Sequence, residues 1–278
     1  MSEELRMSEE LRYNYGNLRD LLLSYGSVAV AFSGGTDSTL LVKVAHDVLG
    51  KRMVAITLAG NATPAGVVRD ARAWAAEEGI EHEVVTFDEL TVPEFAANVP
   101  DRCYHCKKAI FSEIGRVAER QGYAVVADGS NVDDQGDYRP GLRALAELGV
   151  ASPLRDAGFT KADVRALSRE LGLPTWNMPS AACLASRFAY GDPITREKLR
   201  RVEEAEDYLH GLGLAQLRVR VHGDAGEVAR IEVEQDQVAR LAEERTRAEV
   251  VECLRGLGFV YVCLDLTGFR SGAMNEVL

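Results

Sequence analysis

Short apolar runs alternate with amphipathic segments of helical period between residues 28 and 175. The apolar runs predict strands, and the segments between them carry apolar positions at the three-to-four-residue spacing of a helix. Strands that alternate with helices indicate a parallel sheet with helices on both faces, an α/β fold. The expected strands cover 28–32, 53–58, 83–86 and 124–127, and the expected helices cover 38–50, 64–79, 107–121 and 160–171.

The pattern changes near residue 193. A charged amphipathic segment over 195–211 is followed by two alternating runs, 216–222 and 228–233, then by a helical segment over 235–256 and a last apolar run over 259–266. This order predicts a smaller C-terminal α+β domain. We therefore expect two domains, 1–192 and 193–278. The first residues repeat Met-Ser-Glu-Glu-Leu-Arg, and residues 1–13 are expected to form a frayed, solvated helix.

The most informative loop follows the first apolar run and reads Ser33-Gly-Gly-Thr-Asp-Ser38. A strand, a glycine turn and a helix start together form an anion site, because the first turn of the helix has unpaired N–H groups. Gly34 and Gly35 let the backbone close around an oxyanion. A carboxylate beside a phosphate needs a cation between them, so Asp37 predicts Mg²⁺. The alternative is an ordinary turn with Asp37 as a helix-capping residue.

Ligands of parallel sheets bind at the carboxyl ends of the strands. The loop 33–38 therefore shares an edge with Asn61 and with Asp128-Gly-Ser-Asn131, which follow other expected strands. These residues are candidates for binding the same ligand.

Composition narrows the class of protein. The chain has 278 residues, of which 46% are hydrophobic and 27% charged, which is typical of a globular protein. A net charge of −11 disfavours nucleic acid as a partner. No apolar run reaches the length of a membrane span, and the acidic N-terminus has no signal-peptide pattern. We expect a cytoplasmic protein without a membrane partner.

Five cysteines suggest metal or sulfur chemistry before disulfides. Cys103 and Cys106 form a Cys-x-x-Cys pair, and Cys183 stands in an irregular segment rich in small residues. Three thiolates could hold an iron–sulfur cluster with one iron open to an extra sulfide. The pair alone could instead be half a zinc site or a redox pair, and Cys183 alone could be a small core residue. Cys253 and Cys263 follow apolar patterns and are expected in the core.

Charged residues give further candidates, each with a plainer alternative. Lysines at 107 and 108 stand where a helix is expected to start, which suggests a bound phosphate or carboxylate, or else plain solvated side chains. An acidic loop follows the strand 124–127 and could hold Mg²⁺, or could simply be a turn. The residues concerned are Lys107, Lys108, Asp133, Asp134, Asp137 and Arg139.

Basic residues also alternate along the run 216–222, which places Arg218, Arg220 and His222 on one face of a strand. Arg270 follows the last apolar run. Two arginines could converge on a phosphate, whereas the alternative is a solvated strand face.

Taken together, these motifs resemble the LarE family of PP-loop ATP pyrophosphatases. The resemblance runs from about residue 14 to the C-terminus. It rests on Ser33–Ser38, Arg102-Cys-Tyr-His-Cys-Lys-Lys108, Asp137-Tyr-Arg-Pro-Gly141, Cys183-Leu-Ala-Ser-Arg-Phe188 and Gly268-Phe-Arg-Ser-Gly272. The first motif is common to all PP-loop enzymes, and the last three are much more specific.

The resemblance implies an adenine nucleotide alpha hydrolase-like fold and an ATP-dependent sulfur transferase. Such enzymes adenylate the carboxylates of pyridinium-3,5-biscarboxylate mononucleotide and convert them to thiocarboxylates for the nickel-pincer nucleotide cofactor. Some members sacrifice the sulfur of one cysteine. Others have three cysteines, thought to hold a [4Fe–4S] cluster, and this chain resembles them through Cys103, Cys106 and Cys183. The family also implies a homo-oligomer.

Residue by residue, the resemblance implies three groups. The catalytic group is Cys183, Asp37, Lys107, Ser186, Arg187 and Glu206. The nucleotide group is Ser33, Gly34, Gly35, Thr36, Asp37, Ser38, Asn61, Asp128 and Arg139. The substrate-phosphate group is Arg218 and Arg270.

Three other functions fit part of the pattern. A tRNA thiolase shares the glycine loop and often a cluster, but the acidic chain counts against RNA. An amide-forming PP-loop ligase would not need Cys183. A non-catalytic nucleotide sensor or cluster carrier would not release pyrophosphate in response to a carboxylate substrate.

Overall fold

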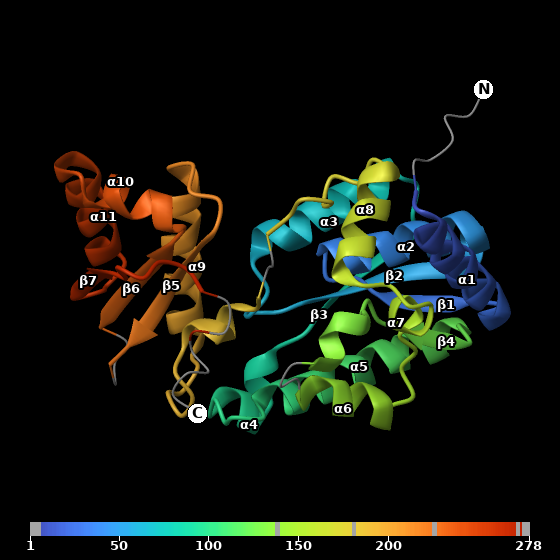
Figure 1. Cartoon of the computed structure of the whole chain (residues 1–278). Coiled ribbons are helices and arrows are strands. Elements are labelled where there is room, and N and C mark those ends of the chain that lie inside the picture. Colours follow the sequence, from blue (N-terminus) through green and yellow to red (C-terminus); the bar gives the residue numbers. More distant parts are fainter. Residues whose placement is uncertain (1–6, 137–139, 180–181, 224–226, 271–272, 274–278) are drawn as a thin grey trace. The chain divides into compact units, whose positions relative to one another are not determined.

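A computed structural model describes residues 7–136, 140–179, 182–223, 227–270 and 273. The chain divides into two compact units (Figure 1). The first comprises Met1–Phe87 and Cys103–Ala181, and the second comprises Asp88–Arg102 and Ala182–Leu278. Asp137 and Arg139 of the acidic loop, and Ser180, lie outside the described residues.

The first unit contains a four-stranded sheet in the order β3-β2-β1-β4, and all of its strand pairs are parallel. Apolar, β-branched runs form these strands because both faces of the sheet are covered. This confirms the predicted α/β class. The strands are β1 (Val28–Ala31), β2 (Met53–Ala59), β3 (His82–Thr86) and β4 (Val125–Ala127).

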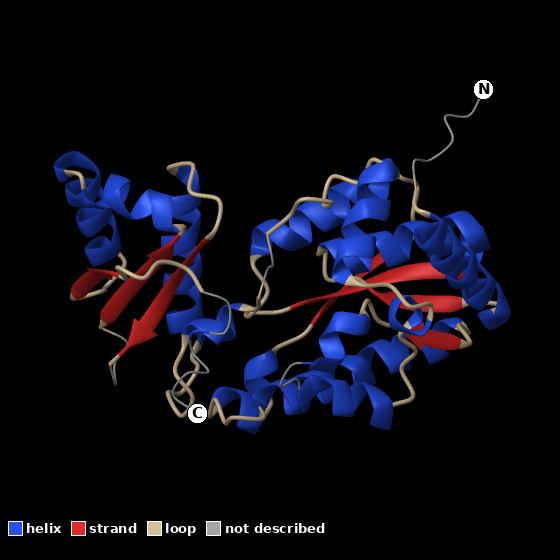
Figure 2. Cartoon of the chain, in the orientation of Figure 1, coloured by secondary structure: helices blue, strands red, loops and turns tan. Residues whose placement is uncertain are grey.

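Two apolar cores cover the two faces of this sheet, and Figure 2 shows the strands between the two layers of helices. One core includes α1 (Glu9–Tyr25), α2 (Thr36–Leu49), α3 (Ala65–Glu77) and α8 (Lys161–Glu170). The other includes α5 (Arg102–Gln121) and α6 (Pro140–Glu147). The short helix α7 (Pro153–Asp156) follows α6.

The second unit has a three-stranded sheet in the order β5-β6-β7. Strands β5 (Leu217–His222) and β6 (Val228–Val233) are antiparallel, and β7 (Tyr261–Leu264) pairs parallel to β6. The mixed sheet and its helices confirm a smaller α+β unit. The helices are α4 (Pro93–Ala96), α9 (Arg196–Gly211), α10 (Val238–Ala242) and α11 (Glu244–Gly256). The single helix expected over 235–256 is divided at Glu243, whose ψ of 141° is extended.

The boundary between the units differs from the expected one at residue 193. Residues 182–192 belong to the second unit, as does the distant segment 88–102. Backbone hydrogen bonds join these two segments, from Gly191 N to Asn98 O at 2.9 Å and from Ile194 N to Ala96 O at 2.8 Å. Pairing between segments so far apart in sequence leaves no local signal.

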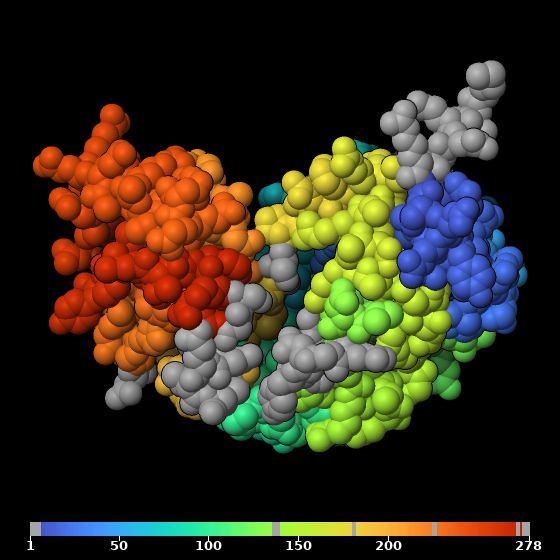
Figure 3. Space-filling view, viewed as in Figure 1, coloured from blue at the N-terminus to red at the C-terminus, as the bar shows by residue number. Residues whose placement is uncertain are grey.

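The N-terminal helix is packed rather than frayed where the structure describes it. Ser8 caps α1 by accepting a hydrogen bond from Leu11 N, and Leu11 is only 4% exposed. Figure 3 shows the outer face of α1, in blue, on the surface of the first unit. The helix therefore has one solvated and one buried face, and the expectation of a frayed helix is wrong over residues 8–13.

Helix α5 begins at Arg102, earlier than the expected residue 107. Its opening residues Cys, Tyr and His are weak helix formers, so the sequence pattern did not mark this start. Cys103 and Cys106 consequently lie in the first turns of α5. Lys107 lies beyond those turns, where the charge of the helix N-terminus no longer opposes it.

None of the helices that the structure describes is long and apolar enough to cross a membrane.

A histidine of β3 supports the end of β1. Thr57 Oγ1 donates to Phe32 O at 2.6 Å, so His82 Nε2, 2.8 Å from the same hydroxyl, donates to Thr57. Burial, together with the nearby charge of Arg72, lowers the pKa of His82. The folded protein therefore resists protonation of His82, and the unfolded chain binds that proton more readily.

The free energy of unfolding should consequently fall as the pH drops below about 6.5 and approaches the lowered pKa of the folded state. A His82→Gln variant keeps an N–H donor but removes the titrating ring, so its stability should fall less steeply between about pH 7 and pH 5. Urea unfolding of both proteins across this range measures the two slopes. Equal slopes would contradict this role of His82.

Candidate active site

Hydroxyl groups hold the loop 33–38 in a closed turn at the carboxyl end of β1. Ser38 Oγ accepts from Ser33 N at 3.2 Å and donates to Gly35 O at 3.1 Å. Gly35 is the N-cap of α2, and no side chain caps this helix. The first turn of the helix therefore offers N–H groups without a side-chain cap, although the Asp37 carboxylate accepts from its own N–H.

Two glycines let neighbouring parts of the chain lie very close to each other at this loop. Gly34 has φ of +74°, and a Cβ there would lie 3.0 Å from the side chain of Val67 on α3. Gly129, in the loop after β4, would place a Cβ 3.0 Å from Ser38 N. Only glycine lets the loop after β4 approach the first turn of α2 so closely.

A cavity of about 440 Å³ lies where these two loops meet, a volume in the range of small-molecule sites. One wall is apolar and comes from β2 and α5, through Ile56, Leu58, Ile110, Phe111 and Ile114. The polar part of the lining includes Ser33, Gly35, Asp37, Ser38, Lys107 and Asp128. Apolar side chains beside a phosphate-type loop in one cavity suit a nucleotide, whose base is apolar on its faces and whose phosphates are charged.

Asp37 is the central acid of this cavity. Burial, and then the charge of Asp134, raise the pKa of Asp37, whereas the hydrogen bond that Asn131 Nδ2 donates to its Oδ1 at 2.8 Å opposes this shift. A nearby cation would stabilise the ionised form of such a carboxylate. The part of the chain that the structure describes holds no cluster of three or more His, Cys, Asp or Glu side chains. Mg²⁺ needs only one or two carboxylates when phosphate oxygens and water complete its shell, so the donors fit it.

Other acids at this edge make local hydrogen bonds. Asp128 accepts from Ser130 and from Ser152, the latter at 2.7 Å. Asp133 accepts from Lys161 N at 2.8 Å and Asp134 accepts from Asn131 N at 3.1 Å. These bonds are the ones that the turn interpretation of the acidic loop expects for Asp133 and Asp134, and Asp134 also lines the cavity.

The two lysines of α5 have different surroundings. Lys107 lines the cavity, and its stem packs against α6, where a Cβ on Gly141 would lie 2.6 Å from Lys107 Cδ. Lys108 is exposed and binds Glu147 at 2.9 Å. The solvated alternative is therefore right for Lys108, and Lys107 is the one that reaches the candidate site.

Three residues expected at the nucleotide do not line this cavity in the described structure: Gly34, Thr36 and Asn61. Gly34 faces a separate pocket against α3. Thr36 Oγ1 donates to Thr175 O at 2.8 Å, so its hydroxyl holds a neighbouring loop. Asn61 lies half-buried in a turn after β2.

Sequence reasoning missed the apolar wall of α5. Ile110, Phe111 and Ile114 look like ordinary core positions of an amphipathic helix. Their spacing marks a buried face, but only the fold shows that this face also borders the phosphate loop.

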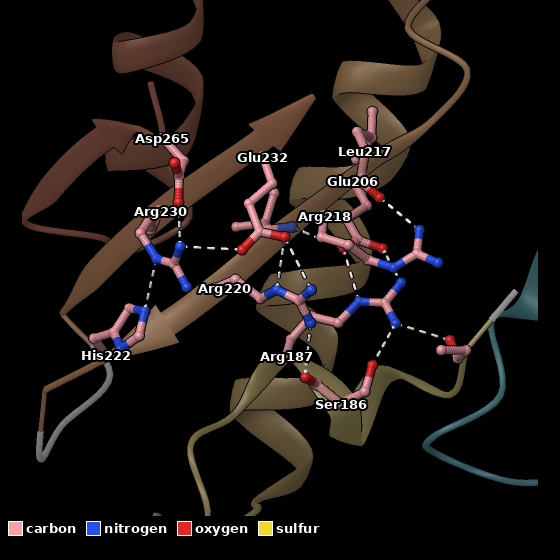
Figure 4. A network of polar contacts seen from close by, with 12 residues as sticks. Ser186, Arg187, Glu206, Leu217, Arg218, Arg220, His222, Arg230, Glu232 and Asp265 are labelled. Atoms are coloured by element: carbon pink, nitrogen blue, oxygen red, sulfur yellow. Dashed lines mark hydrogen bonds and ion pairs between the residues drawn. The ribbon is translucent and has the colours of Figure 1, made fainter. Parts of the chain in front are cut away.

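In the second unit, a buried ion pair holds the segment that carries Cys183 (Figure 4). Arg187 Nη2 lies 2.7 Å from Glu206 Oε2, and both side chains are under one-tenth exposed. Arg187 Nη1 also donates to Ala182 O at 2.8 Å and to Cys183 O at 3.1 Å. Cys183 itself is exposed, so the core alternative for it is wrong.

Ser186 and Glu206 complete this support. Ser186 Oγ accepts from Arg187 Nη1 at 2.9 Å, and Glu206 Oε1 accepts from Val219 N of β5 at 2.8 Å. In this structure Arg187 binds Glu206 and the backbone beside Cys183, and Glu206 binds Arg187 and the backbone of β5.

The basic face of β5 is buried, so the solvated alternative is wrong. Arg218 and Arg220 are 8% and 4% exposed. Arg220 pairs with Glu232 at 2.9 Å, and Arg230 pairs with Glu232 at 3.1 Å and with Asp265. Figure 4 shows this network of Arg187, Arg220, Arg230, Glu206, Glu232 and Asp265 together with Arg218, whose Nη1 donates to Leu217 O at 2.6 Å.

Arg218 is a buried arginine that lies within reach of the charge of its neighbours. Burial, and then the charge of Arg187, lower the pKa of Arg218 to about 10. Its guanidinium lies 5.2 Å from the ring centroid of Phe269, and the exposed Arg270 follows Phe269 directly. The structure thus places the Arg218 side chain beside the segment that carries Arg270.

The remaining cysteines differ in exposure. Cys103 is exposed and Cys106 partly exposed on α5 of the first unit, whereas Cys183 belongs to the second unit. Cys253 is partly buried. Cys263 is exposed, so the expectation of core packing is wrong there: exposure alternates along the edge strand β7, and Cys263 lies on the same exposed face as Tyr261.

No family model matches the chain. It is 44% identical over 262 residues to an uncharacterised protein of Synechocystis, covering 94% of this chain and 97% of that one. It is 42% identical over 252 residues to the pyridinium-3,5-bisthiocarboxylic acid mononucleotide synthase of Lactiplantibacillus plantarum, covering 90% of each. A partial match to the argininosuccinate synthase of Natronomonas pharaonis has 30% identity over 159 residues, 53% of this chain and 39% of that one.

The fold, the glycine loop and these relatives define an enzyme of the PP-loop class. Within that class, the similarity to the mononucleotide synthase covers most of both chains. The chain belongs to the LarE family of sulfur transferases.

The close contact at Gly129 predicts that adding a side chain there lowers the stability of the fold. In Gly129→Ala the new methyl group meets backbone atoms of Ser38, which cannot rotate away, so the free energy of unfolding should fall by about 1–3 kcal/mol. Urea unfolding measures this change.

Gly115→Ala is the matched control, because it lies inside α5 with open space around its Cα, and it should gain about 0.5–1 kcal/mol from helix propensity. Equal stability of Gly129→Ala and the unaltered protein would contradict the close approach.

Proposed function

We propose that this enzyme adenylates the carboxylates of pyridinium-3,5-biscarboxylate mononucleotide with ATP and converts them to thiocarboxylates. The observation that carries the proposal is the cavity between the two glycine loops, where Asp37 and Lys107 face an uncapped helix N-terminus. The relative in Lactiplantibacillus plantarum is named for the corresponding bisthiocarboxylic acid product. The resemblance of the motifs to LarE enzymes supports the same substrate.

The first step activates a poor electrophile. A carboxylate oxygen of the substrate attacks the α-phosphorus of ATP, the bond to the bridging oxygen of the β-phosphate breaks, and pyrophosphate leaves. The first-turn N–H groups of α2 and the Lys107 ammonium would stabilise the negative charge that develops there. Mg²⁺, bound by Asp37, would neutralise charge on the departing pyrophosphate.

The second step replaces AMP by sulfur. An iron–sulfur cluster, when bound, would supply sulfide to the acyl carbon. If Cys183 acts alone, its thiolate attacks that carbon and AMP departs with the former carboxylate oxygen. Removal of the Cys183 α-proton then breaks the Cβ–Sγ bond, which leaves dehydroalanine in the chain and sulfur on the product.

The donor set fits a cluster by its chemistry. Cys103 and Cys106 are three residues apart on α5, so both thiols lie on one side of that helix. Both are accessible to solvent at least in part, and Cys183 is exposed on its own unit. Three accessible thiols in a chain of this family are the ligands that a [4Fe–4S] cluster with one open iron requires.

Arg218 and Arg270 are our candidates for the substrate phosphate. The ion pair of Arg187 and Glu206 would keep Cys183 in place rather than react itself. Arg139 and Asn61 remain candidates from the family resemblance for contacts with the nucleotide. We also propose a cytoplasmic homo-oligomer, because the acidic, cysteine-bearing chain suits a reducing compartment and the family implies an assembly.

Anaerobic reconstitution with iron and sulfide, followed by reaction with ATP, Mg²⁺ and the biscarboxylate mononucleotide, tests the proposal. Mass spectrometry of the substrate should show replacement of oxygen by sulfur, and pyrophosphate should appear only when the carboxylate substrate is present. Cys183→Ala should abolish the thiocarboxylate, whereas Cys253→Ala, a partly buried cysteine of α11, should retain it.

The iron content of Cys103→Ala separates the two sulfur routes. Loss of iron together with loss of turnover supports the cluster, and a single turnover that converts Cys183 to dehydroalanine supports the lone thiol. Thiolation by Cys183→Ala at the normal rate would overturn both routes. Pyrophosphate release without a carboxylate substrate would contradict the adenylation step.

A further inference from the structure

The side chain of Lys107 reaches the cavity at the glycine loop without a polar partner in the described part of the chain. It lines the cavity, and no described residue forms a hydrogen bond or an ion pair with its ammonium group. The next residue, Lys108, is held instead by Glu147 and by the Tyr104 hydroxyl, each at 2.9 Å. The direction of the Lys107 side chain therefore depends on the packing of its aliphatic stem.

This stem packs against Gly141, in the first turn of α6. A Cβ at Gly141 would lie 2.6 Å from Lys107 Cδ, 3.2 Å from its Cε and 3.3 Å from its Cγ. The three atoms nearest to that position all belong to Lys107. The stem thus fills the space that the side chain of any larger residue would need.

Backbone conformation does not explain the glycine. Gly141 is not among the glycines with positive φ, and it lies inside the helix Pro140–Glu147. Glycine in a helix is less stable than alanine, so this residue costs helix stability. Gly115 of α5 is a helical glycine too, but nothing lies within 4 Å of its Cβ position. Crowding by a lysine stem is therefore particular to Gly141.

Contacts within the first unit hold α6 against α5. The Tyr104 hydroxyl of α5 donates to Glu147 Oε2 at 2.7 Å, and the Arg143 guanidinium lies 3.9 Å from the centroid of the Tyr104 ring. Leu145 of α6 is 2% exposed and packs into the same apolar core as α5. These contacts fix the position of α6, and with it the position of Gly141 beside the lysine.

We propose that Gly141 is a positioning residue for the adenylation step, because the space over its Cα directs the Lys107 ammonium into the nucleotide cavity. Gly141 itself touches neither nucleotide nor substrate. The inference rests on the role of Lys107 in the proposed function. It adds to that role the residue that sets where the charge of Lys107 lies.

Gly141→Ala tests the proposal, because its methyl group takes the place of Lys107 Cδ and turns the lysine aside. The kcat of pyrophosphate release from ATP, Mg²⁺ and the biscarboxylate mononucleotide should fall about tenfold to a hundredfold, as expected when a catalytic group is misplaced by about 1 Å. The KM for ATP should change less. A flexible lysine can turn without moving the backbone, so the melting temperature should equal or exceed that of the unaltered protein.

Gly115→Ala is the matched control. It makes the same substitution inside a helix of the same unit, where open space surrounds the new methyl group. It should keep the kcat of the unaltered protein.

A second background shows whether Gly141 acts through Lys107. Lys107→Ala removes both the stem and the ammonium group, so it should slow pyrophosphate release by about 10²–10³-fold. In that background the methyl group of Gly141→Ala no longer meets the stem. The double variant should therefore react at the rate of Lys107→Ala.

The outcomes separate the two proposals. If Lys107→Ala reacts as fast as the unaltered protein, the role of Lys107 in the proposed function fails. If Lys107→Ala is slow but Gly141→Ala keeps the full rate, or if the double variant is slower than Lys107→Ala, the inference about Gly141 is overturned. Should Gly141→Ala not fold, the double variant decides: it should fold because the stem is absent, and its failure to fold would overturn the inference.

Discussion

The candidate site depends on the approach of one backbone to another. The loop after β4 reaches the first turn of α2 because Gly129 has no side chain to hold it away from Ser38. The parallel register of β1 and β4 places both loops at the same edge of the sheet. Asn131 then binds Asp37 across that contact. The helix N-terminus, the acid and the apolar wall of α5 form one cavity only because this approach is possible.

In the second unit, an exposed cysteine, Cys183, stands on an irregular segment of the chain. Such a segment lacks the regular series of backbone hydrogen bonds that fixes the conformation of a helix or a strand. Buried charge does this instead, through Arg187, which spans Glu206 and the carbonyl groups beside Cys183. Removing one partner would leave the other charge buried and unpaired, so the network is sensitive to single substitutions.

Much of this arrangement could be predicted from the sequence. The strand-and-helix rhythm indicates the parallel sheet, and the motif Ser33–Ser38 is enough to mark its functional edge. The packed α1, the early start of α5 and the division near residue 182 could not be predicted, because they depend on contacts between distant segments. Arg218 and Arg220 illustrate the same limit: alternation places them on one face, but only the fold shows that carboxylates from other elements cover that face.

The central claim is that a carboxylate oxygen attacks the α-phosphorus of ATP in the cavity at the glycine loop. Substrate with ¹⁸O in its carboxylates tests this directly. If the claim is right, the ¹⁸O lost from the substrate appears in the phosphate of AMP, and pyrophosphate carries none. Label in inorganic phosphate together with release of ADP, or thiocarboxylate formed with unlabelled AMP, would contradict it.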